Sequence, residues 1–286
     1  MTTAADLATS CTINFCPGCG DIAIWAAFRQ ACIEGNWDNS NTALVAGVGC
    51  HGHMINFVKI TSFGSLHGRA LPVATGIKMA RHDLNVLVFT GDGDSLAEGT
   101  NHFVHSARRN HDITVILHDN AIYGLTTGQT SPRSPHGFVS KSTPGGNLDE
   151  PFNPCALAIT SGATFVGRVF AGDIPSVTAM ILLANAHKGF ALVDVLQPCV
   201  TFNKEYTHEF YRENVYQLPA DFDKTNKLTA LAKAMEWGEK SIPLGILYEE
   251  VKPSYEDQIP VLSQKPLMTN NPVKVRDISE ELKKYQ

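Results

Sequence analysis

The chain has 286 residues, of which 43% are hydrophobic, and a formal net charge of −5 at pH 7. This length and apolar content suit one large globular domain or two small ones. Lysine and arginine are not clustered, so the sequence lacks the basic patch typical of proteins that bind nucleic acid or anionic membranes. No apolar run approaches the ~20 residues of a membrane-spanning helix, and the N-terminal segment has no signal-like pattern. We therefore expect a cytoplasmic protein with no nucleic-acid or membrane partner.

Five short apolar runs predict buried strands, and longer helical stretches lie between them. Apolar strands that alternate with helices are typical of α/β folds, in which crossover helices cover both faces of a mostly parallel sheet. The predicted strands span residues 42–49, 84–91, 112–119, 163–170 and 190–197.

Three helices are expected in the first two thirds of the chain. Residues 94–110 bring apolar side chains near one face and end in basic residues, and residues 173–189 have an early proline and a terminal glycine. Both segments are predicted to be crossovers. A further helix is predicted over residues 21–35, with Asp21 as its capping residue.

The remaining segments predict a loop and a C-terminal extension. Residues 121–152 are rich in Gly, Pro and Ser and lack a hydrophobic period, and a long loop of this kind is commonly functional. After the fifth strand, we expect one helix at 227–238, one strand at 242–249 and a polar arm. We therefore divide the chain into a core, residues 1–200, and an extension, residues 201–286, that packs on the core and on a partner subunit.

Polar residues directly after two of the predicted strands indicate a metal–diphosphate site. Asp92 ends one strand and Asn120 ends the next, about one βαβ unit later. Neighbouring strands lie about 4.8 Å apart and Mg²⁺ takes oxygen ligands at about 2.1 Å, so both side chains can reach one ion. The carbonyl of Ile122 is a candidate third ligand. The competing interpretation is two ordinary turns with Asp92 as a helix cap, which the paired spacing disfavours.

The turn that follows the predicted strand at 84–91 is suited to binding phosphate. Gly91 and Gly93 allow the backbone to approach phosphate groups, and a helix that begins near Ser95 directs its positive N-terminal dipole toward them. Residues 47–52 also fit G-x-G-x-x-G, but no clear helix follows and no acidic residue ends a strand about 20 residues later. A nicotinamide site is therefore disfavoured.

Seven cysteines without a secretory signal indicate reduced thiols. Cys16 and Cys19 form a Cys-x-x-Cys pair, whose spacing alone suits zinc, a redox disulfide or an iron–sulfur cluster. Cys50 and Cys199 each follow a predicted strand, so they reach the sheet edge that also carries Asp92. Four thiolates suit zinc or iron–sulfur, and the wide spacing favours a cluster over compact zinc motifs.

Three cysteines remain outside this set. Cys32 and Cys155 fall in or near predicted helices, and we expect both to be small buried core residues. Cys11 lies near the Cys-x-x-Cys pair and is a minor candidate for a substitute ligand.

The stretches "CPGCGD", "GVGC", "GDGD", "HDNAIYGLT" and "PCVTFN" together resemble the β subunit of the 2-oxoacid:ferredoxin oxidoreductases over about residues 10–250. The stretches "SLHGRALPVATGIKMA" and "NHFVHSARRN" resemble the same family. The resemblance implies a thiamine diphosphate-binding fold and CoA-dependent oxidative decarboxylation of a 2-oxoacid, of the 2-oxoglutarate or pyruvate class. The products would be acyl-CoA and CO₂, with electrons passing through a 4Fe-4S cluster to ferredoxin.

The resemblance also implies roles for individual residues. The 4Fe-4S cluster would be held by Cys16, Cys19, Cys50 and Cys199, and Mg²⁺ by Asp92, Asn120 and the Ile122 carbonyl. The thiamine diphosphate pocket would comprise Gly49, Cys50, His67, Gly91, Asp92, Gly93, Asp94, Asn120, Tyr123, Gly124, Leu125 and Thr126. His67 and Arg69 would lie near the reacting groups as candidate catalytic residues, or else form a hydrogen-bond network at a helix entry.

One stretch departs from the family pattern. His51 and His53 stand where many relatives have a small and a cationic residue, so substrate and CoA contacts are not transferred to them. We expect these imidazoles to line or tune the site instead.

The sequence supplies one diphosphate-binding edge and no acid to activate the aminopyrimidine, which the resemblance assigns to an α subunit. We therefore expect an obligate α partner in an (αβ)₂ assembly, with any further clusters in partner chains. Two alternatives stay open at this point: a non-redox thiamine decarboxylase or synthase subunit, and a zinc-stabilised, non-catalytic interaction subunit. Iron-free protein would favour the first, and zinc without thiamine binding the second.

Overall fold

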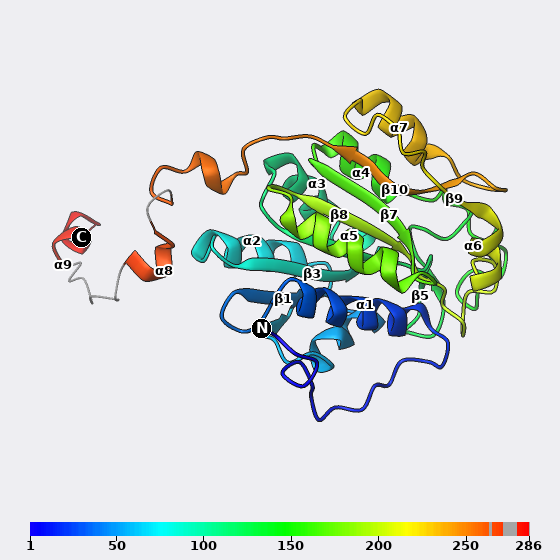
Figure 1. Cartoon of the computed structure of the whole chain (residues 1–286), viewed down its shortest axis with the longest axis horizontal. Coiled ribbons are helices and arrows are strands. Elements are labelled where there is room, and N and C mark those ends of the chain that lie inside the picture. The colour runs from blue at the N-terminus through cyan, green and yellow to red at the C-terminus, as the bar shows by residue number, and fades with distance from the viewer. Residues whose placement is uncertain (263–264, 271–278, 286) are drawn as a thin grey trace.

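The computed structural model describes residues 1–262, 265–270 and 279–285. In this part of the chain one sheet dominates the fold (Figure 1). Its strands run in the spatial order β2 (Ser62–Gly64), β1 (Thr42–Ala46), β3 (Asn85–Gly91), β4 (Thr114–Asp119), β8 (Ala191–Leu196), β7 (Phe165–Phe170), β10 (Ile242–Glu249) and β9 (Val215–Gln217). Only the β7–β10 pair in this sheet is antiparallel. The predicted fold class, a mostly parallel α/β sheet, is confirmed.

Helices cover both faces of the sheet. On one face α1 (Gly20–Glu34) packs against α5 (Ile174–Ala186), and the other face carries α2 (Ala70–Ala80), α3 (Thr100–Arg109), α4 (Pro154–Ser161) and α7 (Lys227–Met235). Strand β3 shows the alternation that this layering requires. Leu87 and Phe89 join the core under α1 and α5, whereas Val86 and Val88 join the core on the opposite face. Each such side chain contributes about 1.5–3 kcal/mol when fully buried.

All five predicted strands are present, each shortened at one or both ends. The elements that were not predicted include β2, α2, β9 and α6 (His208–Asn214). Pro72 and Gly76 interrupt the helical pattern of α2, and both residues have low helix propensity. The other three elements are too short to show a period.

The helix predicted over 94–110 is present in two parts. A π-helical turn, Asp94–Glu98, precedes α3, and the two segments meet at Gly99. The first residue of this turn, Asp94, contacts two other loops, which are described below. π-Helical turns of this kind are frequent at functional sites.

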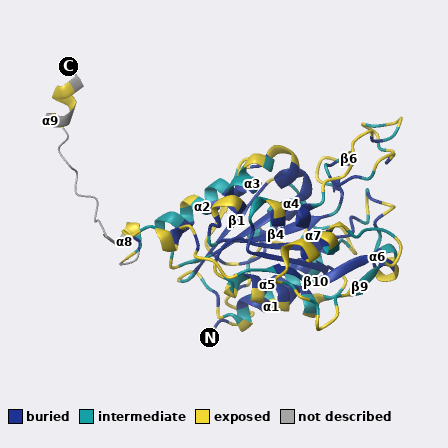
Figure 2. Ribbon diagram, turned by 90° about the horizontal axis from the view of Figure 1, so that it is seen from above, coloured by how far each residue is buried: buried dark blue, intermediate teal, exposed yellow. Residues whose placement is uncertain are grey.

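The loop at 121–152 is not wholly structureless, because it contains the antiparallel pair β5 (Ile122–Tyr123) and β6 (Gln129–Thr130). Figure 2 shows the stretch around β6 as exposed coil that extends from the body. The base of the loop is anchored by Arg133, which is buried. Its Nε donates to Asp119 Oδ2 at 2.8 Å, and its guanidinium lies 4.7 Å from the centre of the Trp237 ring.

Beyond β10 the chain leaves the sheet, as Figures 1 and 2 both show. Glu256, in the short 3-10 helix Glu256–Gln258, accepts a hydrogen bond from the Asp112 backbone and pairs with His111 at 2.7 Å. The described residues of the arm include α8 (Leu267–Asn270), which contacts α2, and α9 (Ser279–Leu282). No helix in the described ranges combines the length and apolarity needed to cross a membrane.

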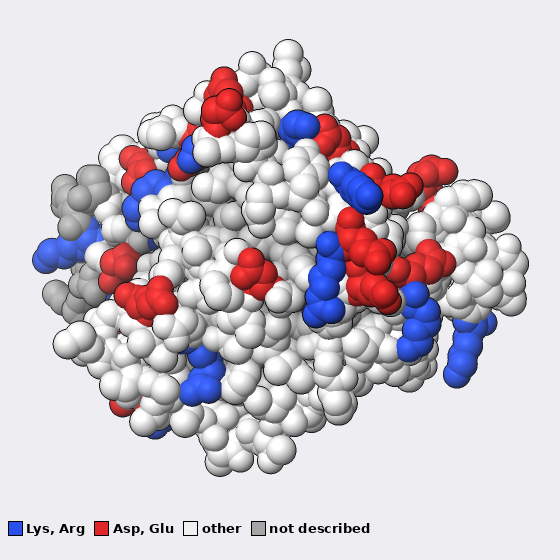
Figure 3. All heavy atoms as spheres, turned by 45° about the vertical axis from the view of Figure 1, so that its right-hand side comes forward, with Lys and Arg blue, Asp and Glu red and all other residues white. Residues whose placement is uncertain are grey.

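Figure 3 shows the face that includes the right-hand side of Figure 1. Acidic and basic side chains lie interspersed on both sides of this face, and few of them lie at its centre. Cys32 and Cys155 are fully buried, as predicted, and Cys11 is exposed.

Candidate active site

The carboxyl ends of β3 and β4 meet as predicted, because these strands are parallel neighbours with Gly91 opposite His118. Asp92 and Asn120 therefore line one pocket of about 80 Å³, which we call the β3–β4 pocket. Its wall comprises Val48, Gly49, Cys50, His51, His67, Gly91, Asp92, Gly93, Asp94, Asn120, Ile122, Tyr123, Gly124, Leu125 and Thr126. The structure thus brings together every residue expected around the thiamine cofactor, whereas Arg69 is not part of this wall.

Asp92 is the buried acid of this pocket, with only 2% of its surface exposed. Burial, followed by the nearby Asp119 carboxylate, raises the pKa of Asp92 to about 8. The Ser131 hydroxyl donates a hydrogen bond to Asp92 Oδ2. A buried carboxylate with this environment is stabilised as an anion by a bound cation, and its oxygens are of the type that Mg²⁺ prefers.

Asn120 is held by both ends of its amide. Its Oδ1 accepts from the Ile122 backbone at 3.0 Å, and its Nδ2 donates to Gln197 Oε1 at 2.8 Å. Among the described residues, no three His, Cys, Asp or Glu side chains meet as a preformed metal centre. The Mg²⁺ ligands expected here include an amide and a backbone carbonyl, so this set stays a proposal.

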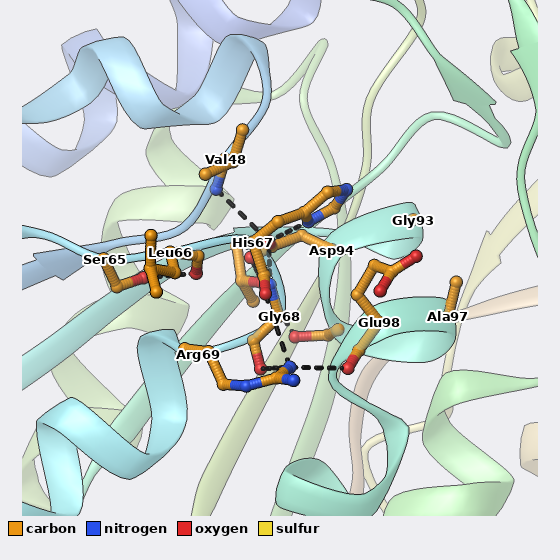
Figure 4. Close-up of polar contacts among 12 residues, drawn as sticks. Val48, Ser65, Leu66, His67, Gly68, Arg69, Gly93, Asp94, Ala97 and Glu98 are labelled. Carbon is orange, nitrogen blue, oxygen red and sulfur yellow. Dashed lines mark hydrogen bonds and ion pairs between the residues drawn. The ribbon is translucent and has the colours of Figure 1, made fainter.

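Asp94 connects three loops of the pocket (Figure 4). Its Oδ1 accepts from His67 Nδ1 and the Gly68 backbone, both at 2.7 Å, and from the Val48 backbone at 3.2 Å. Its Oδ2 accepts from Thr90 Oγ1 at 2.7 Å. The protein itself therefore occupies both carboxylate oxygens, and Asp94 shapes the pocket wall.

The negative charge of Asp94 is stabilised by the hydrogen bonds that its carboxylate accepts and by the nearby His51. Burial alone would raise its pKa, but His51 and the Gly68 backbone, with other donors, hold the pKa well below its usual range. Asp94 is thus an anion that braces the loops around the pocket.

The two candidate catalytic residues lie differently. His67 lines the pocket, and because Asp94 holds its Nδ1, its Nε2 is left for a ligand. Arg69 is exposed, and its guanidinium donates to the backbone carbonyl of Glu98 at 2.9 Å (Figure 4). In this arrangement Arg69 joins α2 to the turn before α3, which matches the alternative of a hydrogen-bond network at a helix entry.

A second cavity, of about 250 Å³, contains all four cysteines of the expected cluster, and we call it the cysteine cavity. Cys16, Cys19, Cys50 and Cys199 line it. A Cβ built on Gly124 would lie 3.5 Å from the sulfurs of both Cys50 and Cys199, so the loop backbone passes directly beside them. The two cavities share the wall residues Cys50, Asn120, Gly124 and Leu125.

Two of these thiols are strongly affected by burial. Burial raises the pKa of Cys50 to about 12, and burial together with the Asp21 carboxylate raises the pKa of Cys19. Such thiols stay protonated until a metal centre replaces the protons. Thiols are the ligands that soft metals and iron–sulfur clusters take, but the four cysteines do not meet as a preformed metal centre among the described residues, so their role as ligands stays a proposal.

The prediction that Asp21 caps α1 was wrong. The residue before the helix is Cys19, and no side chain caps the first turn. Asp21 lies within that turn and points toward β4, where its Oδ1 pairs with His118 Nδ1 at 2.6 Å. Its Oδ2 accepts from Cys19 Sγ at 3.5 Å.

The two histidines that depart from the family pattern serve different cavities. His51 is buried in the β3–β4 pocket, with its ring 5.7 Å from that of His118 and its Nε2 3.7 Å from Asp94. His53 lines the cysteine cavity and stacks on Phe57. Both imidazoles therefore line the site, as expected.

Sequence reasoning missed three polar residues of the site: Ser131, His118 and Gln197. His118 is a polar residue that directly follows the apolar run of β4 near its carboxyl end, which is a signal for a buried function. Gln197 immediately precedes the Pro-Cys of the fourth cysteine. Ser131 lies in the loop at 121–152, where no sequence pattern marked it as a site residue.

A parallel sheet with a glycine-rich, acid-bearing pocket at its carboxyl edge defines the class of thiamine pyrophosphate enzymes. Residues 47–195 match the family model described as "Thiamine pyrophosphate enzyme, C-terminal TPP binding domain". Residues 199–264 match the family model for the C-terminal part of the pyruvate ferredoxin oxidoreductase beta chain. The chain belongs to the family of β subunits of the 2-oxoacid:ferredoxin oxidoreductases.

Individual relatives support this assignment. The chain is 45% identical to the 2-oxoacid:ferredoxin oxidoreductase subunit beta of Sulfolobus sp over 260 residues, which covers 86% of this chain and 85% of the relative. It is 43% identical to the corresponding subunit of Saccharolobus solfataricus, over 91% of this chain and 88% of the relative. The solved 2-oxoglutarate:ferredoxin oxidoreductase from Magnetococcus marinus superposes with a TM-score of 0.87 at 37% identity, covering 99% and 95% of the two chains. The redox family is therefore supported over the non-redox and zinc-stabilised alternatives.

Proposed function

We propose that this chain is the cofactor-bearing subunit of an enzyme that oxidatively decarboxylates a 2-oxoacid of the 2-oxoglutarate or pyruvate class to acyl-CoA and CO₂. The observation that carries the proposal is the shared wall of the two cavities, formed by Cys50, Asn120, Gly124 and Leu125. This wall separates the β3–β4 pocket from the cavity that the four cysteines line, and Cys50 belongs to both. The solved relative with 2-oxoglutarate, coenzyme A and succinyl-CoA bound supports the substrate class.

The β3–β4 pocket would hold thiamine diphosphate with Mg²⁺. Asp92, Asn120 and the Ile122 carbonyl would bind the ion, and the backbone at Gly91 and Gly93 would face the phosphates. When bound, thiamine diphosphate supplies the carbon nucleophile and electron sink that decarboxylation of a 2-oxoacid requires. His67, whose Nδ1 is held by Asp94, would present its Nε2 to the ligand.

The cysteine cavity would hold a 4Fe-4S cluster on Cys16, Cys19, Cys50 and Cys199. Such a cluster accepts electrons one at a time and passes them on, with ferredoxin as the external acceptor. The protein's contribution would be to hold the four sulfurs beside the β3–β4 pocket, with Cys199 buried, Cys19 and Cys50 half-buried and Cys16 exposed.

An α subunit would complete the site in an (αβ)₂ assembly located in the cytoplasm. Apolar side chains are exposed on pocket-wall loops and on the adjoining loop: Val48 at 41%, Leu125 at 49% and Leu66 at 79%. Exposed apolar residues that gather in this way are typical of surfaces covered by a partner. CoA would enter as co-substrate once this partner is bound.

The test is anaerobic co-expression of the chain with an α subunit, followed by iron and sulfide analysis and CoA-dependent viologen reduction. We expect about four irons per αβ pair, and reduction with 2-oxoglutarate or pyruvate that depends on CoA. Cys16→Ser should lose iron, whereas Cys11→Ser, an exposed cysteine outside the cavity, should keep it. An iron-free complex with no reduction for either acid would refute the proposal.

A further inference from the structure

Gln197 lines the cysteine cavity, and its side chain contacts Asn120, which lines both cavities. It directly follows β8, donates its backbone N–H to the Asp119 carbonyl at 2.9 Å, and is 1% exposed. Its Oε1 accepts from Asn120 Nδ2 at 2.8 Å, and its Nε2 donates to Cys19 Sγ at 3.2 Å. One amide therefore contacts a proposed Mg²⁺ ligand and a proposed cluster ligand.

The Gln197 side chain is fixed by its surroundings. Its Nε2 also donates to the carbonyl of Pro198 at 3.1 Å, and that carbonyl accepts from the Gly20 backbone at 3.1 Å. A Cβ on Gly20 would come within 2.8 Å of Gln197 Cγ, so the start of α1 packs against this side chain without room for a larger residue. A buried amide with all its contacts made in this way has one orientation.

Each end of the amide has a distinct consequence. At one end, the hydrogen bond from Asn120 Nδ2 fixes the amide so that Asn120 Oδ1 faces away from Gln197, and this oxygen, which accepts one hydrogen bond from the Ile122 backbone, has a second lone pair for a cation. At the other end, a hydrogen bond donated to a cluster sulfur stabilises the more negative, reduced state, which raises the reduction potential. The Asp21 carboxylate contacts the same Cys19 sulfur. It opposes this effect on the reduction potential, because a nearby anion disfavours the added electron of the reduced cluster.

We propose that Gln197 is a positioning residue for both cofactors: it orients Asn120 for Mg²⁺ and raises the reduction potential of the cluster through Cys19. The inference rests on the proposed function. One neutral side chain would thus influence both the thiamine site, where the electrons originate, and the cluster, which receives them.

Two substitutions of Gln197 distinguish its hydrogen bond with Asn120 from its hydrogen bond with Cys19. Gln197→Met fills a similar volume but makes neither hydrogen bond. Gln197→Glu keeps an oxygen acceptor for Asn120 in either protonation state. Gln217→Glu, at an exposed position of β9, is the matched control.

The experiment uses the anaerobic complex with its α subunit. The cluster's midpoint potential is measured by a redox titration followed by electron paramagnetic resonance, and retained Mg²⁺ and thiamine diphosphate are measured after gel filtration. We expect Gln197→Met to shift the midpoint potential to a more negative value and to lose Mg²⁺ and thiamine diphosphate. Gln197→Glu should retain both, and Gln217→Glu should match the wild type in both measurements.

An unchanged midpoint potential in Gln197→Met, with a full iron content, would overturn the proposal. Loss of Mg²⁺ and thiamine diphosphate from Gln197→Glu to the same extent as from Gln197→Met would also overturn it. If the wild-type complex contains no iron and gives no cluster signal, the proposed function itself fails, so the two failures are distinguishable.

Discussion

The carboxylate of Asp94 accepts a hydrogen bond from His67 Nδ1 at 2.7 Å, and this contact fixes the orientation of the one imidazole in the β3–β4 pocket that is partly open to solvent. Because Asp94 also binds the backbone of Gly68 and Val48, the orientation of His67 and the shape of the pocket depend on the same side chain. A change at Asp94 should therefore affect cofactor binding without direct contact to the cofactor.

Asp94→Asn should weaken thiamine diphosphate binding roughly 10–100-fold, as is typical when a group that orients ligand-binding residues is replaced. The amide cannot accept from all four donors and loses the charge that favours them. Affinity can be measured by calorimetric titration of the αβ complex at fixed Mg²⁺. Asp83→Asn, in an exposed pair with Arg81, should leave the affinity unchanged. Equal affinities for Asp94→Asn and wild type would contradict this role.

Arg133→Met should lower the free energy of unfolding by about 3–5 kcal/mol, because it leaves the buried Asp119 carboxylate without its ion-pair partner. Arg81→Met breaks a more exposed pair and should cost about 0–1 kcal/mol. Chemical denaturation of both variants provides the comparison. If both variants lose the same stability, Arg133 does not anchor the loop at 121–152 in the way its contacts indicate.

Glu256 should make the stability of the chain depend on pH. Burial alone would raise its pKa, but the hydrogen bonds from His111 and the Asp112 backbone outweigh burial and lower the pKa below its ordinary value of 4.5. A lowered pKa in the folded state means that the contribution is complete above pH 4.5 and is lost as the pH falls through the folded-state pKa.

Glu256→Gln should therefore destabilise the protein by about 1–3 kcal/mol at neutral pH, and the difference from wild type should shrink at acidic pH. Unfolding free energies across this range test the sign. Glu205→Gln, at an exposed position, serves as the control. A difference that grows toward acidic pH would show that the assigned direction is wrong.

Gly93→Ala should narrow the β3–β4 pocket. A Cβ at this position would collide with the Tyr123 ring, whose hydroxyl donates to the Gly93 carbonyl at 3.1 Å. We expect weaker cofactor binding with little change in secondary structure, measured by titration and circular dichroism. Gly145→Ala, where a Cβ meets nothing within 4 Å, should behave like wild type. Unimpaired binding by Gly93→Ala would mean that Tyr123 can move without consequence.

The parts of the site that the sequence predicted are those set by local pattern. Asp92 and Asn120 each end an apolar strand, and the ends of adjacent parallel strands meet whatever the details of the loops. The same argument places Cys50 and Cys199 at this edge, whereas Cys16 and Cys19 directly precede α1 and line the same cavity. Their roles as ligands remain predictions, since a sulfur-lined cavity does not by itself name the metal.

The contacts that could not be predicted depend on side-chain pairs from distant segments. His118 and Asp21 lie in β4 and α1, and only the packing of that helix against the sheet brings them to 2.6 Å. A capping role for Asp21 was the local expectation, and tertiary pairing overrode it. The short helix α6 and the strand β9 likewise depend on contacts beyond their own sequence, because segments of this length have no measurable period.

The wall between the β3–β4 pocket and the cysteine cavity limits which substitutions this protein can accept during evolution. Because Gly124 and Leu125 face both cavities, a substitution there that adjusts the fit of one cofactor also disturbs the other. Substitutions in this loop are thus selected against at both cavities. New substrate preferences are more readily acquired on surfaces that face only one cavity or the α partner.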